Sequence, residues 1–167
     1  MAEGLFITRK DLVKFTSVNG NVDSDKFLQY IKIAQDIHVR NYLGSDLFNK
    51  IQDDIEASTL AGDYLTLVTD YVKPMIIHWA MVEYLPFAAY TIANKGVFKH
   101  GSENASNVEK EEVDFLIEKE RDIAQYYTDR FIDYMSFNAS SKYPEYYSNS
   151  NEDVYPDKNA NFEGWVL

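Results

Sequence analysis

Apolar residues recur at helical spacing along most of this chain. A short helix is expected to start at Thr8 and to carry an apolar face as far as Phe15, where the polar run 19–21 ends it. Asp23 is placed to cap a second helix. The apolar positions of that helix continue to Gly44, a residue suited to a left-handed C-terminal stop.

Two more helices are expected between this glycine and the first proline. Ser45 is placed to cap one of them, with an apolar stripe that reaches Ile55. The next begins at Asp63 and keeps helical spacing up to Pro74. Because proline lacks an amide proton, Pro74 should end or kink that helix.

A central helix is expected over residues 75–92, with apolar side chains on nearly every side. The stretch is close to the length of a membrane span, but it carries His78, Glu83 and Pro86. We therefore expect a buried core helix that Pro86 bends.

The last helix has the clearest pattern. It follows a polar run over 96–107 without periodicity, which indicates a long surface loop. Ser106 and Glu109 fit a capping box at its start, and one apolar face continues from Val113 to Met135.

Helical spacing disappears after Asn138, where tyrosine, serine, asparagine and proline dominate. These patterns predict an all-α fold: a helical bundle of about five helices, with a long central and a long C-terminal helix, plus an extended C-terminal arm. We expect a helical domain over residues 1–138 and the arm over residues 139–167.

Composition narrows the range of functions. The chain has 167 residues, a formal net charge of -11 and no cysteine. The acidic balance argues against sequence-independent binding to nucleic acid and against anionic membranes, and the lack of cysteine excludes disulfides and thiolate chemistry. Aromatic residues make up 15% of the chain, which indicates interfaces as well as a core. No secretion signal is recognisable near Met1, so we expect the protein to stay where it is made.

No constellation for catalysis or metal binding is evident in the sequence. His38, His78 and His100 fall in two different helices and a loop, without the i, i+4 spacing of a helical metal site. Glu83 is the best single candidate for an enzymatic role, but a lone acid on a buried helix is more often simply paired. We therefore expect no catalytic residue, no cofactor and no metal.

Two short segments superficially resemble calcium loops. Acidic and amide residues alternate over 19–25 and over 157–161, but neither segment completes the pattern. Turn and capping chemistry explains the first segment.

The arm has two possible interpretations. It is either a disordered tail or a segment that becomes ordered on a neighbouring protein, because tyrosine provides contact area with little rotamer entropy to lose. We favour the second reading. The partner-binding candidates are Tyr143, Tyr146, Tyr147, Tyr155, Phe162 and Trp165.

Two motifs resemble a known family of structural proteins. The first is the T-x-x-D-L start at residues 8–12, and the second is the A-Q-x-x-I…Y-L-G-x-x-L pattern within residues 27–48. Together with the order of helices over roughly residues 5–135, they resemble the head-tail connector proteins of tailed bacteriophages. The nearest likeness is to portal-proximal ring proteins of crAss-like and other Bacteroidetes phages.

The resemblance implies a virion protein of the portal vertex that assembles in the host cytoplasm. Such proteins form a ring, usually a dodecamer, that docks on the portal protein and on the next tail or connector ring. Double-stranded DNA passes through the ring without specific binding, and the family implies no catalytic residues and no membrane. The alternative reading is a monomeric acidic helical adaptor or inhibitor that binds a basic partner protein.

Overall fold

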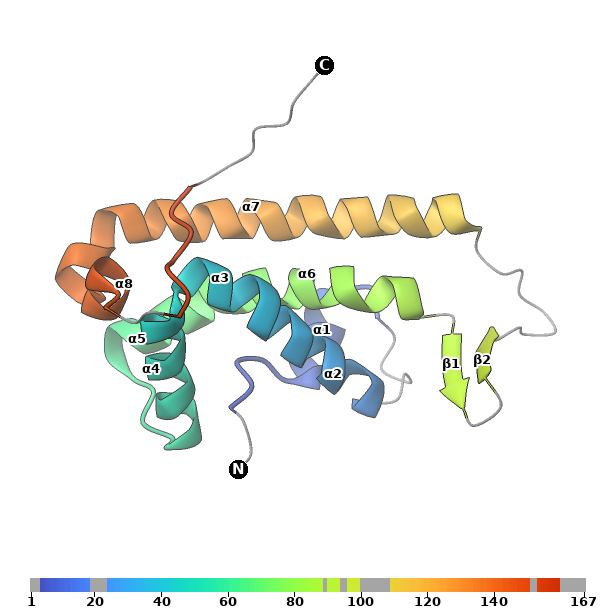
Figure 1. Cartoon of the computed structure of the whole chain (residues 1–167), viewed down its shortest axis with the longest axis horizontal. Coiled ribbons are helices and arrows are strands. Elements are labelled where there is room, and N and C mark those ends of the chain that lie inside the picture. Colours follow the sequence, from blue (N-terminus) through green and yellow to red (C-terminus); the bar gives the residue numbers. More distant parts are fainter. Residues whose placement is uncertain are drawn as a thin grey trace, which may run out of the picture.

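The computed structural model describes residues 4–18, 24–88, 90–93, 96–99, 109–150 and 153–159. Over these residues the fold is all-α apart from one small hairpin, as the sequence predicts. In Figure 1, α7 forms one long edge of the molecule, and α6, α2 and α3 lie along its inner side. The hairpin lies at one end, and α4, α5 and α8 lie at the other.

The elements follow one another in this order: α1 (Arg9–Phe15), α2 (Ser24–Ala34), η1 (Gln35–Val39), α3 (Arg40–Leu43), α4 (Ser45–Glu56), α5 (Gly62–Leu67), η2 (Val68–Val72), α6 (Lys73–Tyr84), η3 (Leu85–Phe87), β1 (Tyr90–Ala93), β2 (Gly96–Lys99), α7 (Lys110–Lys142) and α8 (Pro144–Ser148). Both η1 and η2 are single π turns, and η3 is a 3₁₀ turn. Since α2, η1 and α3 are continuous, they form one helical rod, called the α2–α3 rod below.

Pro74 does not end the helix that contains it, which is one of the two outcomes that the sequence predicts for this proline. A π turn precedes this proline, and the helix continues from α5 through α6. Proline cannot donate to the carbonyl of Asp70, four residues earlier, but the Nη1 group of Arg130 on α7 donates to that oxygen at 3.1 Å. A side chain therefore replaces the hydrogen bond that the proline removes.

The central helix is shorter than predicted. It ends at Tyr84 and passes into η3, which contains Pro86, instead of continuing to Ile92. The hairpin follows, with Thr91 opposite Phe98 and Ala93 opposite Gly96 in an antiparallel register. Part of the predicted surface loop is thus a β-strand, while residues 100–108, which include His100 and Ser106, lie outside the described residues.

Helix α7 differs from the prediction at both ends. Its capping box consists of Glu109 and Glu112, where the Glu109 amide donates to Glu112 Oε2 at 3.0 Å. At its other end α7 continues through Asn138 to Lys142, and Pro144 then occupies the first position of α8, which tolerates a missing amide proton. The C-terminal arm is therefore helical at its base, and its extended part begins after α8.

The core lies between α6, α7 and the α2–α3 rod. Residues 75–77 and 79–82 of α6 are all buried, which confirms the prediction of a core helix. The Trp79 indole donates to Thr128 Oγ1 at 3.0 Å, and the Thr128 hydroxyl donates to the Ala124 carbonyl at 2.8 Å. Both buried polar groups on the α6–α7 interface are thus hydrogen-bonded.

One buried side chain holds the N-terminal segment. Gln35 is fully buried; its Oε1 accepts from the Phe6 amide at 2.9 Å, and its Nε2 donates to the Gly4 carbonyl at 3.0 Å. The Gly4 amide also donates to Glu56 Oε1 at 2.9 Å. The segment before α1 is therefore bound to the middle of the α2–α3 rod and to the end of α4.

Candidate functional site

The turn between α3 and α4 binds residues 149–157, which lie near the C-terminus of the chain. Gly44 forms this turn with φ of 74° and ψ of 158°, a conformation that glycine adopts far more readily than other residues. A Cβ atom on Gly44 would lie 2.7 Å from Cδ of Pro156 and 2.9 Å from Oδ1 of Asn149. Glycine is thus required both by the backbone and by the close approach of residues 149–156.

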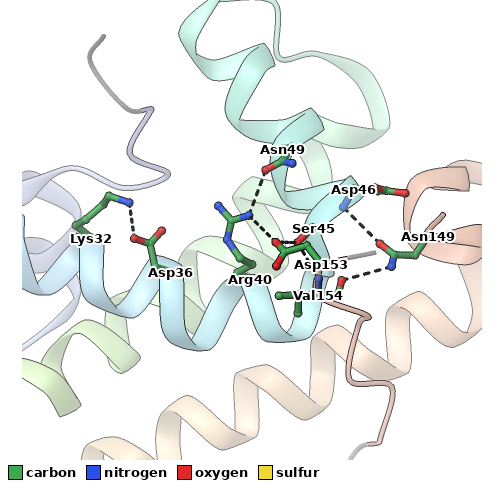
Figure 2. A network of polar contacts seen from close by, with 9 residues as sticks. All are labelled: Lys32, Asp36, Arg40, Ser45, Asp46, Asn49, Asn149, Asp153 and Val154. Carbon is green, nitrogen blue, oxygen red and sulfur yellow. Dashed lines mark hydrogen bonds and ion pairs between the residues drawn. The ribbon is translucent and has the colours of Figure 1, made fainter. Parts of the chain in front are cut away.

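Ser45 makes the central contacts of this site (Figure 2). Its amide donates to the Val154 carbonyl at 2.9 Å, and its Oγ accepts from the Val154 amide at 3.1 Å. The hydroxyl proton goes to Asp153 Oδ2 at 2.6 Å. Helix α4 begins at Ser45 with Gly44 at its N-cap position, so the sequence-based assignment of Ser45 as the cap of that helix is wrong.

Residues from the other end of the chain cap α4 instead. The first amides of a helix have no partner within the helix. The Ser45 amide is bound by Val154, and the Asp46 amide donates to Oδ1 of Asn149 at 3.4 Å. Asn149 Nδ2 donates to the Val154 carbonyl at 3.3 Å, which joins the two halves of this cap.

The same segment also binds the C-terminal end of the α2–α3 rod. The Asp157 amide donates to the Asn41 carbonyl at 2.9 Å. Arg40 lies 4.0 Å from the centre of the Phe48 ring, donates to Asn49 Oδ1 at 3.3 Å, and lies 3.8 Å from Asp153 Oδ2. The Arg40–Asp153 pair is half open to solvent, so we assign the anchoring mainly to the backbone contacts.

Two of the predicted partner-binding tyrosines are buried within the chain. Tyr143 is fully buried, and its hydroxyl donates to the Asp63 carbonyl at 3.0 Å and lies 3.0 Å from the Tyr134 hydroxyl. Burial, followed by the hydrogen bond with Tyr134, raises the pKa of Tyr143. Tyr146 packs edge-on against Phe131, and burial raises its pKa to about 12.

The other predicted anchors differ from these two. Tyr147 and Tyr155 are 62% and 63% exposed, so their rings are open to solvent. Phe162 and Trp165 lie outside the described residues. Partner binding through Tyr147, Tyr155, Phe162 and Trp165 stays a prediction, whereas the surfaces of Tyr143 and Tyr146 already form part of this chain's core.

A shallow pocket lies beside the exposed Tyr147. It has a volume of about 320 Å³, and its apolar wall comes from Ile132, Met135 and Ala139 of α7. Ser136, Ser140, Tyr146, Tyr147 and Lys158 complete the lining. The C-terminal segment thus borders a concave surface where the described residues end, one residue after Lys158.

Two histidine–glutamate pairs join the helices of the core. His38 Nε2 lies 2.7 Å from Glu83 Oε1, and the His38 ring stacks on Trp79 with 4.0 Å between ring centres. His78 Nδ1 lies 2.7 Å from Glu120 Oε2. Glu83, the candidate acid from the sequence, is thus paired with a histidine, and each pair links two helices.

The described residues offer little for catalysis with a metal. Within the described ranges, no group of three or more histidine or acidic side chains is placed to hold a metal ion. Asp157, from the second segment that resembles a calcium loop, accepts a hydrogen bond through its Oδ1 from the Asn159 amide at 3.0 Å, which is a local turn contact.

Among the described residues, no helix combines the length and apolarity needed to cross a membrane.

Comparison with known proteins places the chain in a family. A family model matches residues 39–155, which is more than half of the chain. The chain belongs to DUF6712, a family of unknown function. No curated protein and no solved structure matches it.

The part of the chain matched by DUF6712 begins and ends near the same place in space. Its first residues lie in the α2–α3 rod just before Gly44, and its last residues include Asp153 and Val154, which bind Ser45. Most of the site therefore lies within the DUF6712 match. The sequence indicated Gly44 and Ser45 as a tight turn, but no local pattern marked Asn149 or Val154 as their partners.

Proposed function

We propose that this protein is a structural subunit that works by assembly: a head-tail connector protein of a tailed bacteriophage. In this role its copies form a ring, dodecameric in the connectors that it resembles, that docks on the portal and joins it to the tail. The ring surrounds passing double-stranded DNA without binding it specifically.

The observation that best supports this proposal is the fixed base of the C-terminal segment. Hydrogen bonds with Ser45 and with the Asn41 carbonyl hold residues 153–157 on the body of the protein. The sequence then continues with Phe162 and Trp165, only a few residues beyond this anchored base. A short aromatic segment that leaves a fixed point loses less entropy on docking than a long free tail does.

The exposed tyrosines support the same role. Tyr155 belongs to the anchored residues 153–157, Tyr147 precedes them in α8, and both side chains keep more than half of their surface open to solvent. Large amphipathic rings of this kind are enriched in protein interfaces. The net charge of -11 adds to this, because acidic channel walls would not retain the phosphates of passing DNA.

The decisive experiment is imaging by cryo-electron microscopy, with and without the portal protein of the same phage. We expect rings of the intact protein that dock coaxially on the portal. The variant with Phe162→Ser and Trp165→Ser should lose portal docking, because it removes the aromatic contacts that the C-terminal segment supplies. A matched control, Asn159→Ser with Asn161→Ser, should dock normally.

Two results would contradict the proposal. A protein that stays monomeric and never associates with the portal would favour the adaptor or inhibitor reading, particularly if it captured a basic protein. Docking that persists unchanged in the Phe162 and Trp165 variant would remove the C-terminal segment from the contact.

A further inference from the structure

The outer face of α7 carries large apolar side chains that keep more than half of their surface exposed; within α7, Lys119 Nζ lies 5.6 Å from the Phe115 ring centre and Tyr127 meets Tyr126 edge-on. Phe115, Tyr126 and Phe137 are 56%, 64% and 83% exposed. At about 100° per residue, positions 115, 119, 122, 126, 130, 133 and 137 fall within roughly an 80° arc of the helix. We call these seven positions the outer stripe of α7.

The outer stripe is arranged symmetrically about Tyr126: at equal distances from it, apolar residues match apolar residues and each charged residue matches one of opposite charge. Phe115 and Phe137 each stand eleven residues from this tyrosine. Lys119 and Asp133 each stand seven residues from it and have opposite charges. The order along the helix is therefore self-complementary about one residue.

The innermost pair follows the same rule. Asp122 and Arg130 each stand four residues from Tyr126 and also have opposite charges. Arg130 already donates to Asp70 through Nη1 and lies 4.6 Å from the centre of the Tyr71 ring. Its guanidinium carries further N–H donors, so it can serve a second acceptor.

We propose that a second copy of this chain binds the outer stripe, with the two α7 helices antiparallel and a twofold axis at Tyr126. In that arrangement residue 126+n faces residue 126−n of the partner. Each phenylalanine then meets the other phenylalanine, each Lys119 meets an Asp133, and each Asp122 meets an Arg130. The two Tyr126 rings meet at the axis.

The size of the stripe sets the expected strength. Residues 115–137 span about 33 Å at 1.5 Å per residue, and one helix face of this length buries on the order of 1,000 Å² in a pair. That is below the standard size of a stable interface, so we expect dimers with a dissociation constant of about 10 µM. This contact is isologous and differs from the head-to-tail contact of a ring, so it goes beyond the proposed function and stands or falls independently of it.

Charge reversal gives a selective test. In Lys119→Asp an aspartate faces Asp133 twice across the axis, and in Asp133→Lys two lysines face each other twice. Each variant alone should dimerise about tenfold more weakly than the unchanged protein, since like charges directly opposite repel. An equimolar mixture of the two should regain the original affinity, because every facing pair is again opposite in charge.

Sedimentation equilibrium measures these affinities, and native mass spectrometry identifies the mixed dimer. Matched controls are Lys26→Asp and Asp53→Lys, which make the same charge changes at exposed positions of α2 and α4. These should weaken association by less than about threefold each and show no preference for mixing. Dimerisation of both stripe variants at the original strength, or a wild-type protein that stays monomeric at about 200 µM, would overturn the proposal.

A thiol probe gives a readout that is independent of the size of the assembly. The chain has no cysteine, so Tyr126→Cys introduces a single thiol at the proposed axis. Facing residues of two antiparallel helices come close enough for a disulfide, so mild oxidation should crosslink most of this variant. Phe15→Cys, at an exposed position of α1, is the control and should crosslink far less. Equal crosslinking of the two variants would contradict an axis at Tyr126.

Discussion

Gly44 and Ser45 are neighbours in sequence and act together at the site where the two ends of the matched region meet. Gly44 allows the chain to turn and leaves room for Pro156, while Ser45 binds Asp153 and Val154 through its amide and hydroxyl. Neither residue has a large side chain, so the contact depends on close approach of backbones. At this site a single added carbon is therefore a substantial change.

Gly44→Ala should lower the free energy of unfolding by about 2–3 kcal/mol, because alanine disfavours this backbone conformation and its Cβ meets Pro156. Urea unfolding measures the change. Gly62→Ala is the control, since Gly62 also has a positive φ, of 60°, but has nothing within 4 Å of an added Cβ. It should cost about 1 kcal/mol. Equal losses in the two variants would mean that the contact with residues 149–156 contributes nothing.

The buried tyrosines predict a loss of stability in alkali. Burial raises the pKa of Tyr146 to about 12, above the value of 10.0 for a free tyrosine, so the folded state holds this proton more tightly than the unfolded state does. The stabilisation is complete below pH 10 and is lost between pH 10 and pH 12, at no more than about 1.4 kcal/mol per pH unit. Tyr143 and Tyr64 have raised pKa values for the same main reason and add to the loss.

Urea unfolding at several pH values between 8 and 11 tests this. Tyr146→Phe should make the alkaline decline shallower, whereas Tyr147→Phe, at a position that is 62% exposed, should leave it unchanged. An alkaline decline that is identical in the unchanged protein and in Tyr146→Phe would assign the effect to other groups.

At the scale of elements, helical spacing predicted most of the fold. The helices before Gly44, after Ser45 and after Glu109 are where the apolar periodicity placed them, because burying one face of a helix requires that periodicity. The sequence is less informative where a distant residue decides the local structure. The helix does not end at Pro74, and Arg130, on another helix, donates to the carbonyl that the proline leaves without its usual amide partner. No sequence window around Pro74 contains that information.

The base of the arm was mispredicted for a similar reason. Residues 143–148 are polar and contain a proline, but Tyr143 and Tyr146 pack inward against Tyr64 and Phe131. Tyrosine can serve a core or an interface, and its spacing over so short a segment does not distinguish the two uses. The extended part predicted by the sequence is present only beyond α8.

Truncations at two positions should therefore have very different effects. Deletion of residues 160–167 should leave the unfolding midpoint within about 2 °C of the intact protein, since it leaves the contacts of Ser45 in place. Deletion of residues 139–167 removes Tyr143, Tyr146 and the cap of α4, and should abolish cooperative folding or lower the midpoint by more than about 10 °C. Circular dichroism on heating distinguishes these outcomes. A stable, cooperatively folded product of the longer deletion would show that residues 143–157 are only an attachment.

At the scale of the whole molecule, the charge of the chain acts on every assembly that it forms. A net charge of -11 makes copies repel one another over a distance set by the ionic strength. The screening length falls from about 30 Å at 0.01 M salt to about 8 Å at 0.15 M. Close contacts between opposite charges are screened less than this long-range repulsion.

We therefore expect ring assembly to strengthen as salt increases over this range. Sedimentation velocity across a salt series would report the fraction of protein in rings. Sucrose at a matched viscosity is the control, because it changes hydrodynamics without screening charge. Better assembly at low salt would contradict the idea of a self-repelling acidic subunit.

The candidate site was the least predictable part of the molecule. The sequence placed the turn at residues 44–45, but the residues that bind it lie 108 and 109 positions away along the chain. Contacts at that separation leave no periodic trace in a single sequence. The exposed Tyr147 and Tyr155 were found because tyrosines are unusual in a polar segment, and that signal does not depend on the fold.

Both ends of the described chain are attached to the α2–α3 rod. Gln35 binds residues 4–6, and the contacts at Asn41 and Ser45 bind residues 153–157, where the rod ends. A mechanical load applied beyond residue 159 thus reaches these few hydrogen bonds before it reaches the packed core of α6 and α7. In a protein that links other components under tension, the hydrogen bonds that hold residues 153–157 would therefore break first. The packed core of α6 and α7 would stay folded.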